Sequence, residues 1–255
     1  SATAQVQDEI NVLFIGNSFT ARHDLSKLVK KVFEQGKPVL NVNVENIGYG
    51  GQSLFQHTEY YYSQSFIEQA TIDDAIIRER IKKMEELLEL DEPPQEFIHF
   101  WKDIRERKTV PEFPKNLIEI AVNRHKNLLN NPRTKWDYVV LQSWMDEVED
   151  TDFGYARYAG YLTTIVKEQG AEVVLYITAP DIQNQAPVTE PLKQDDVDRE
   201  INYVLELARE IQPYAVVHVP LAINMIQEGG TDLTFRYVND FHPNQRTAFL
   251  TANMF

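Results

Sequence analysis

Two short segments near opposite ends of the chain carry side chains that could together form a serine-nucleophile site. Residues 12–15 are an apolar run that stops at a Gly-Asn-Ser turn, so Ser18 lies just past a strand expected to be buried. Near the other end, His242 closely follows Asn239 and Asp240. A neutral imidazole accepts a serine proton at neutral pH when a carboxylate or amide oxygen fixes its other ring nitrogen. The two segments therefore predict a hydrolase.

Ser18 also has a simpler interpretation, because a serine between a strand and a helix often caps the helix. Gly16 would let the backbone turn sharply without a Cβ clash, and the next helix is expected to begin near Asp24. The positive end of that helix dipole would then lie close to the hydroxyl. The serine alone does not separate capping from catalysis, and the histidine segment favours catalysis.

The other five histidines are interpreted as surface residues or satisfied core residues, because their spacing is not that of a metal site. They are His23, His57, His99, His125 and His218. The chain has no cysteine, which excludes disulfides, thiolate metal sites and a cysteine nucleophile. No metal and no cofactor are expected in the chemistry.

Donors for the negative charge of a tetrahedral intermediate are expected in two further places. Residues 46–53 contain three glycines, and glycine lets a backbone N–H approach a ligand oxygen closely, although a flexible turn is the alternative. Gln142 ends another apolar run and could donate its side-chain amide, or it could cap its own loop. Substrate contacts are expected from Asn17, Tyr49 and Trp144, and packing is the alternative for both rings.

The elements that must position these residues follow from five apolar runs rich in Val and Ile, with helical patterns between them. Strands are expected at 11–15, 39–47, 138–142, 172–178 and 215–219, and helices at 25–35, 155–169, 197–211 and in the final segment. This alternation predicts a parallel sheet covered on both faces, in a three-layer α/β/α sandwich of the flavodoxin-like kind. Ligands bind beyond the carboxyl ends of such strands, where Ser18, Gly51 and Gln142 fall.

The stretch 55–136 interrupts the alternation and predicts a helical insertion between the second and third strands. It contains a charged helical run at 72–90 and a further helical pattern at 116–129. We expect the insertion to overhang the site as a lid or wall, or else only to cover the sheet. The whole chain, 1–255, is interpreted as one domain.

Composition narrows the classes of partner. The 255 residues are 43% hydrophobic, which suffices for a sizeable core, and the net charge of −14 argues against a nucleic-acid partner. No apolar stretch approaches the ~20 residues that span a bilayer, so no membrane partner is expected. Ala2-Thr3-Ala4 resembles the end of a cleaved export signal, which favours a periplasmic or secreted protein; an arbitrary boundary is the alternative.

Three blocks of the sequence, in this order, resemble those of the SGNH or GDSL-type hydrolase superfamily. The first is Gly-Asn-Ser-Phe at 16–19, where that family holds its nucleophile. The second is 46–53, whose later glycine provides an oxyanion N–H in the family. The last is Asn-Asp-Phe-His-Pro at 239–243, which is similar to Asp-x-x-His-Pro. The resemblance extends over nearly the whole chain.

The resemblance implies an α/β fold and a serine mechanism. Ser18 would be the nucleophile, His242 the general base, and the N–H groups of Ser18 and Gly51 the oxyanion donors. The third block of the family, Gly-x-Asn-Asp, is absent, and Gln-Ser-Trp-Met stands at 142–145 instead. Gln142 is the best substitute for the oxyanion asparagine. This variant resembles the branch that contains carbohydrate acetylesterases.

A second departure concerns the acid that would orient His242. The family has Asp three residues before the histidine, whereas here Asn239 holds that position and Asp240 lies two residues before. Asn239 could orient the imidazole through Oδ1 but lacks a full charge, so a weakened or dyad-like catalyst stays open. Asp240 could serve only if the turn is remodelled, and we favour Asn239 by geometry.

Together these features predict a serine esterase that removes small acyl groups, expected to be acetyl groups from carbohydrates. The expected partner is a small acyl ester or an acylated carbohydrate. The alternative is a catalytically weak or inactive glycan-binding protein, because the acid is missing and the third block is altered. A flavodoxin-like protein that binds phosphate at residues 18–20 ranks last, since it leaves His242 unexplained.

Overall fold

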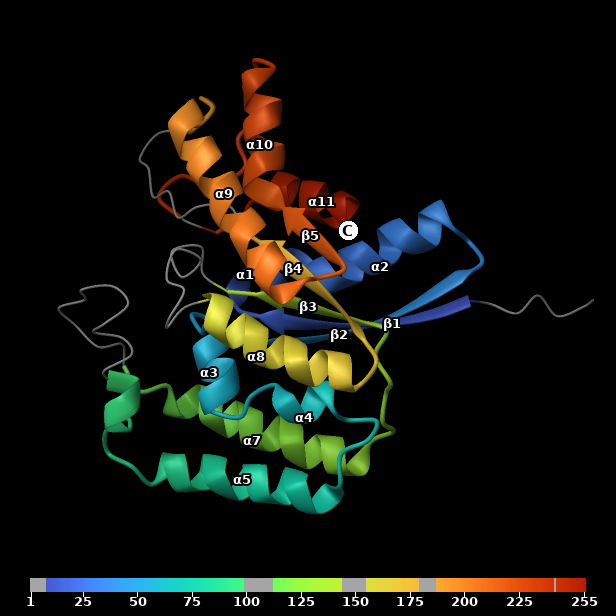
Figure 1. The fold of residues 1–255 in the computed structure, drawn as a ribbon, viewed down its shortest axis with the longest axis vertical. Coiled ribbons are helices and arrows are strands. Elements are labelled where there is room, and N and C mark those ends of the chain that lie inside the picture. Colours follow the sequence, from blue (N-terminus) through green and yellow to red (C-terminus); the bar gives the residue numbers. More distant parts are fainter. Residues whose placement is uncertain (1–7, 99–111, 144–154, 179–186, 241) are drawn as a thin grey trace, which may run out of the picture.

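The computed structural model describes residues 8–98, 112–143, 155–178, 187–240 and 242–255 (Figure 1). Its centre is a five-stranded sheet in the order β2-β1-β3-β4-β5, with every neighbouring pair parallel. The strands are β1 (Asp8–Gly16), β2 (Leu40–Gly48), β3 (Tyr138–Gln142), β4 (Glu172–Ile177) and β5 (Ala215–His218). The predicted α/β fold with a parallel sheet of about five strands is confirmed.

Helices cover both faces of this sheet. They are α1 (Ser18–Ala21), the 3-10 turn η1 (Arg22–Asp24), α2 (Leu25–Gly36), α3 (Leu54–Glu59), α4 (Gln64–Ile67), α5 (Asp74–Leu88), α7 (Lys115–Asn130), α8 (Tyr155–Glu168), α9 (Gln194–Ile211), α10 (Val219–Glu228) and α11 (Gln245–Met254). The strand order reverses between β1 and β3, and ligands of doubly wound sheets bind at such a switch point. Ser18 lies two residues past the end of β1.

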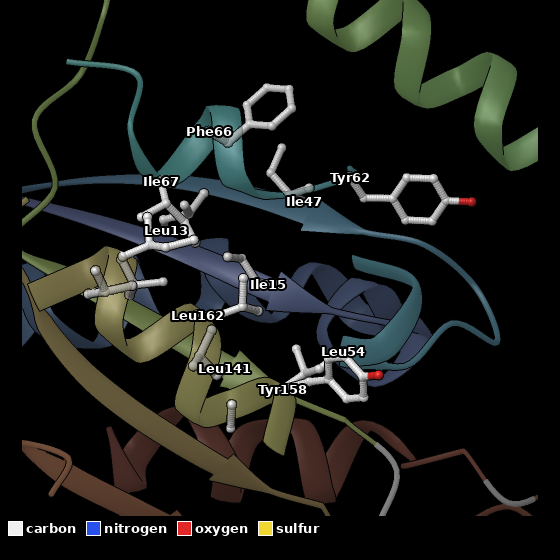
Figure 2. Packing of buried hydrophobic residues seen from close by; sticks show 14 of the residues in the cluster. Leu13, Ile15, Ile47, Leu54, Tyr62, Phe66, Ile67, Leu141, Tyr158 and Leu162 are labelled. Carbon is white, nitrogen blue, oxygen red and sulfur yellow. The ribbon is translucent and has the colours of Figure 1, made fainter. Parts of the chain in front are cut away.

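The alternation of side chains along β1 divides the core into two clusters, because successive residues of a strand point to opposite faces. Leu13 and Ile15 join a large cluster with α8, α9 and the helices that precede β3, whereas Phe14 joins a smaller one with α2, α10 and α11. Figure 2 shows Leu13 and Ile15 beside Ile67 of α4 and Leu162 of α8. Burial of both faces fixes β1, and therefore the turn that follows it.

The predicted helical insertion lies between β2 and β3 and contains α3, α4, α5 and α7 among the described residues. α3 and α4 contact α8, whereas α5 packs along α7 farther from the sheet (Figure 1). One face of the sheet therefore carries a second layer of helices. None of the helices that the structure describes has both the length and the apolar character needed to cross a bilayer.

Candidate active site

The turn after β1 presents Ser18 as the first residue of α1. The helix is capped by Asn17, whose Oδ1 accepts the N–H of Phe19 at 3.0 Å. The capping interpretation of Ser18 is therefore wrong, because the neighbouring asparagine does the capping. The Ser18 hydroxyl is left to bond outside its own helix.

Gly16 ends β1 for a reason that the sequence did not indicate. A Cβ atom at Gly16 would lie 2.3 Å from Oε1 of Gln142 and 2.8 Å from Cγ2 of Thr20. The backbone is not left-handed there, so the glycine is needed for close approach of two side chains rather than for the turn itself. The Gly-Asn-Ser turn is thus fitted tightly against the end of β3.

Ser18, His242 and Asp240 form a continuous hydrogen-bonded chain. Nε2 of His242 lies 2.9 Å from Oγ of Ser18, and Nδ1 lies 2.6 Å from Oδ1 of Asp240. A carboxylate can only accept, so Nδ1 carries the proton and the lone pair of Nε2 faces the serine hydroxyl. The residues at 18 and 242 are far apart in the sequence and meet at one edge of the sheet.

The expectation that Asn239 orients the imidazole is wrong. Asn239 is exposed and adopts a left-handed backbone with φ of 57° in a turn closed by the N–H of Asp240 on the carbonyl of Tyr237 at 3.4 Å. Asparagine tolerates this conformation better than most residues. The turn lets Oδ1 of Asp240 accept both the ring N–H and, at 2.9 Å, the backbone N–H of His242. This is the remodelling that Asp240 needs.

The Asp240 carboxylate is stabilised in its charged form. Its pKa is lowered first by the backbone N–H of His242, then by the imidazole, and least by the guanidinium of Arg22. Nη1 of Arg22 lies 3.3 Å from Oδ2 of Asp240, and both side chains are partly exposed. The charge is therefore present at neutral pH, where it would favour protonation of His242 during proton transfer.

The segment after His242 is held from two sides. Nε2 of His23 donates to the carbonyl of Pro243 at 3.1 Å. Asn244 caps α11 by accepting the N–H of Thr247 at 3.1 Å, and its Nδ2 donates to the carbonyl of Thr234 at 2.7 Å. Arg22, His23 and Asn244 were not predicted from the sequence as supports of this turn. The only available signal was that the first two closely follow Ser18.

The glycine loop after β2 lies beside the Gly-Asn-Ser turn. Gly16 and Gly48 are paired in the register of β1 and β2, and the N–H of Tyr49 donates to the carbonyl of Gly16 at 3.1 Å. Gly51 is exposed and has φ of 71°, a conformation that favours glycine. Within the described chain no acceptor takes the backbone N–H of Ser18 or Gly51. Both groups can therefore serve an incoming oxygen.

Gln142 does not fit its predicted role as an oxyanion donor. The side chain is 0% exposed, its Oε1 accepts the N–H of Asn17 at 2.9 Å, and its Nε2 donates to the carbonyl of Ser143 at 2.7 Å. Because both ends of the amide are engaged within the core, the residue supports the Gly-Asn-Ser turn from inside the molecule.

The two predicted substrate contacts that the structure describes are buried, so they do not fit the predicted role. Tyr49 is 2% exposed and stacks on Tyr62 with ring centroids 4.3 Å apart, while Arg124 lies 4.6 Å above its ring. Burial raises the pKa of Tyr49 to about 12. Asn17 is 1% exposed and occupied with capping. Trp144 lies outside the described residues, as does His99.

The remaining described histidines are structural. His57 and His125 are buried, and burial lowers the pKa of each to about 4, while His218 accepts the N–H of Leu221 at 3.1 Å as the cap of α10. In the part of the chain that the structure describes, no three His, Asp or Glu side chains converge as metal ligands would.

Comparison with known proteins identifies the fold. No family model matches the sequence, and no curated protein matches it. A proposed SGNH hydrolase from Slackia heliotrinireducens superposes with a TM-score of 0.53 and 15% identity over 97% of each chain. A two-domain esterase active on acetylated mannans gives a TM-score of 0.49 and 14% identity over 98% of this chain and 48% of its own. An acetyl xylan esterase gives 0.46 and 12% over 96% and 97%.

Proposed function

We propose that this chain, which has the fold of an SGNH hydrolase, is a serine esterase that removes small acyl groups. The observation that carries the proposal is the chain of contacts from Asp240 through His242 to Ser18, at 2.6 and 2.9 Å. These distances are within the range in which a base can take a proton from a hydroxyl. The carboxylate, imidazole and hydroxyl are also in the order that nucleophilic catalysis by serine requires.

In the first half of the reaction, Oγ of Ser18 attacks the ester carbonyl carbon while its proton passes to Nε2 of His242. Asp240 keeps its charge and stabilises the imidazolium that forms. The tetrahedral intermediate collapses when the C–O bond to the alcohol breaks and His242 returns the proton to the leaving oxygen. The acyl group then remains on Ser18 as an ester.

The negative charge on the intermediate is met by the backbone N–H groups of Ser18 and Gly51. The hydrogen bond between Tyr49 and Gly16 ties their two loops together, which supports a fixed spacing between the donors. Fixed donors need no reorganisation as the charge develops, and each is typically worth ~3 kcal/mol of the barrier. Gln142 contributes by holding the N–H of Asn17 rather than by touching the oxygen.

In the second half, water attacks the acyl carbon and gives its proton to Nε2 of His242. The bond to Oγ of Ser18 breaks, the serine recovers a proton from the imidazolium, and the carboxylic acid leaves. The cycle restores Ser18 and His242 to their starting protonation states, because the serine proton that leaves with the alcohol is replaced by a proton from water, and it consumes one water per ester. The residues described supply all of these transfers.

For the substrate we propose acetylated carbohydrate. The Gln at the third block, which resembles that of carbohydrate acetylesterases, supports this assignment. A second support is Tyr237, which is 42% exposed on the same turn as Asp240 and lies against His23 with ring centroids 6.2 Å apart. An exposed ring at the rim of the site offers an apolar face on which a sugar ring can stack.

The alternative of an inactive glycan-binding protein rested partly on a missing acid. The carboxylate of Asp240 on His242 removes that reason, so the esterase is the function that we retain. The altered third block does not by itself abolish catalysis, because the two backbone N–H donors that meet the oxygen belong to residues outside that block.

Hydrolysis of p-nitrophenyl acetate, butyrate and octanoate, together with acetate release from glucose pentaacetate, tests the proposal. We expect the acetyl esters to be preferred and Ser18→Ala to lower kcat by at least ~10⁴-fold with an unchanged thermal unfolding temperature. If Ser18→Ala and the wild type give the same rate on every ester, the protein is not a serine esterase. A preference for octanoate would instead overturn only the assignment to acetyl groups.

A further inference from the structure

A buried histidine next to the glycine loop makes contacts that a packing residue does not need. His57 lies on α3, which begins three residues after Gly51, and it is 0% exposed. It cannot touch a substrate. Both of its ring nitrogens are nevertheless used, one toward Gly16 at the end of β1 and one toward Ser63.

These two contacts fix the proton on one ring nitrogen. Nε2 lies 2.7 Å from the carbonyl oxygen of Gly16, which can only accept, so Nε2 is protonated and donates. Nδ1 therefore accepts from the hydroxyl of Ser63 at 2.5 Å. The helix that follows the glycine loop is thus bonded directly to the residue that starts the Gly-Asn-Ser turn.

The carbonyl of Gly16 is a junction of three segments. It accepts the N–H of Tyr49 at 3.1 Å, from the loop that leads to Gly51, and the Nε2–H of His57, from α3. It also immediately precedes Asn17 and Ser18. This carbonyl group and its two donors therefore link the position of the serine to that of the loop that carries the Gly51 N–H.

The imidazole cannot turn away from this junction. Its ring meets the edges or faces of Tyr49 at 5.6 Å and Tyr62 at 5.8 Å between centroids, and these two tyrosines stack on each other. Arg124 of α7 lies above Tyr49 and donates to the carbonyl of Gly48 at 3.4 Å. The inserted helices thus support the glycine loop from beneath the site.

The donor remains in place across the working pH range. Burial lowers the pKa of His57 to about 4, against a smaller opposing effect from the Gly16 carbonyl. The ring is therefore neutral at pH 5 to 8, and its single proton stays on Nε2, where the carbonyl requires it.

We infer that His57 is a positioning residue, which sets the nucleophile turn and the Gly51 loop at the spacing that the tetrahedral intermediate needs. This inference rests on the proposed esterase function. It assigns the insertion a supporting role in catalysis, because part of the inserted segment holds the N–H of Gly51 at a fixed position relative to Ser18. The donated proton of Nε2 is the feature that matters.

Two amide substitutions at position 57 test the roles of the two ring nitrogens of His57 separately. Gln can place its Nε2 where the histidine has Nε2, whereas the shorter Asn reaches only the Nδ1 position. With p-nitrophenyl acetate we expect His57→Asn to lower kcat by about 30-fold with KM within about threefold, because a small misplacement of reacting groups has effects of this size. We expect His57→Gln to restore kcat to within about fivefold of the wild type.

His125 provides the matched control. It is also 0% exposed and its pKa is also lowered to about 4 by burial, but Nδ1 donates to the carbonyl of Ala121 within its own helix at 2.8 Å. We expect His125→Asn to lower the unfolding temperature and to leave kcat within about twofold of the wild type. Loss of a buried histidine would then not itself explain the fall in kcat.

Ser63→Ala keeps the test decisive if His57→Asn does not fold, because it removes only the hydroxyl that fixes the ring. We expect kcat about fivefold lower at unchanged KM. The inference is overturned if the folded His57→Asn protein, or in its absence Ser63→Ala, keeps the wild-type kcat, or if Gln and Asn at position 57 act alike. Equal rates for wild type and Ser18→Ala would instead overturn the proposed function, so the two failures are distinct.

Discussion

The two turns that meet between Ser18 and His242 are stabilised by different means. The turn after β1 is buried: Asn17 caps α1, its own N–H is held by Gln142, and the carbonyl of Gly16 has two donors. The turn at residues 237–240 is largely exposed, and the carboxylate of Asp240 holds His242 through its ring N–H and its backbone N–H.

This difference separates the kinds of damage that substitutions should cause. In the buried turn the same contacts fix the fold and the position of Ser18, so activity and stability should fall together. In the exposed turn the contacts fix only the orientation and charge of an imidazole, so activity should fall alone. The substitutions and pH measurements below test this difference between the buried turn and the exposed turn.

The largest effect is expected from Asp240→Asn. The amide cannot stabilise an imidazolium and can hold His242 in the wrong tautomer, so kcat should fall by about 10³- to 10⁴-fold. The free energy of unfolding in urea at pH 7 should change by less than ~1 kcal/mol, because the side chain is partly exposed.

Asn239→Gly is the control for this substitution, since glycine accepts the left-handed φ of 57° without strain. Its kcat should stay within about threefold of the wild type. If Asn239→Gly instead showed the large loss and Asp240→Asn the small one, the orienting role would belong to Asn239 after all.

A smaller effect on rate, joined to a loss of stability, is expected from Gly16→Ala. The new Cβ must displace Oε1 of Gln142, which leaves the buried N–H of Asn17 without its acceptor. We expect the unfolding free energy to fall by about 1–3 kcal/mol and kcat to fall by about 100-fold.

Gly160→Ala on α8 makes the same chemical change where a Cβ meets nothing within 4 Å. A helical glycine costs about 1 kcal/mol relative to alanine, so this variant should be more stable and equally active. A Gly16→Ala protein that keeps full stability would show that the buried turn is less tightly fitted than its contacts indicate.

As the pH is lowered, the protein should lose folding stability first through His57 in the buried region, and only at lower pH through Asp240 in the exposed turn. The pKa of His57 is lowered by burial from its unfolded value of 6.5 to about 4, so the unfolded state binds more protons between these values and stability falls as pH falls through that window. The full shift corresponds to about 3 kcal/mol, of which about 2 kcal/mol should be lost between pH 7 and pH 5.

Asp240 should contribute to acid sensitivity only at lower pH. Its pKa is lowered from 3.8, so its contribution is present above that value and is lost below it. Urea unfolding of the wild type and His57→Gln at pH 7 and pH 5 measures the difference directly. Identical pH dependence in the two proteins would exclude His57 as a source of the loss.

The smallest effect is expected from Arg22→Gln. The guanidinium contacts Oδ2 of Asp240 in a partly exposed pair, and it is the weakest of the influences that lower the pKa of that carboxyl. We expect kcat to fall about two- to threefold at low salt, and the difference should shrink in 1 M NaCl as the pair is screened. A large, salt-independent loss would mean that the exposed turn depends on Arg22 for its shape.

Some features of the site were predictable because they depend on neighbours in the sequence. The apolar runs of β1 and β3 indicated buried parallel strands, and the Gly-Asn-Ser turn after β1 indicated where a hydroxyl would emerge. The positions of Ser18 and Gly51 at the carboxyl edge followed from the strand order of such sheets. These features depend on residues that are close together in the chain, so the sequence is enough to predict them.

Other features were missed because they depend on contacts between distant segments. Gln142 looked like a donor at the edge of the sheet, but the close approach of Gly16 draws its amide into the core. Tyr49 looked like a substrate platform, but Tyr62 and Arg124 cover it. No pattern near either residue reveals which segment will fold over it.

The alternation of strands and helices, the edge at which chemistry can occur and the residue types brought there can all be inferred from the sequence alone. The choice between Asn239 and Asp240 depends on the folded chain, through a single left-handed residue whose φ is permitted but not dictated by its side chain. The folded chain also determines which polar side chains make their hydrogen bonds inside the molecule, as His57 and Gln142 do. The apolar periodicity is a property of each segment, whereas the hydrogen-bond partners of a buried group depend on which distant segments pack against it.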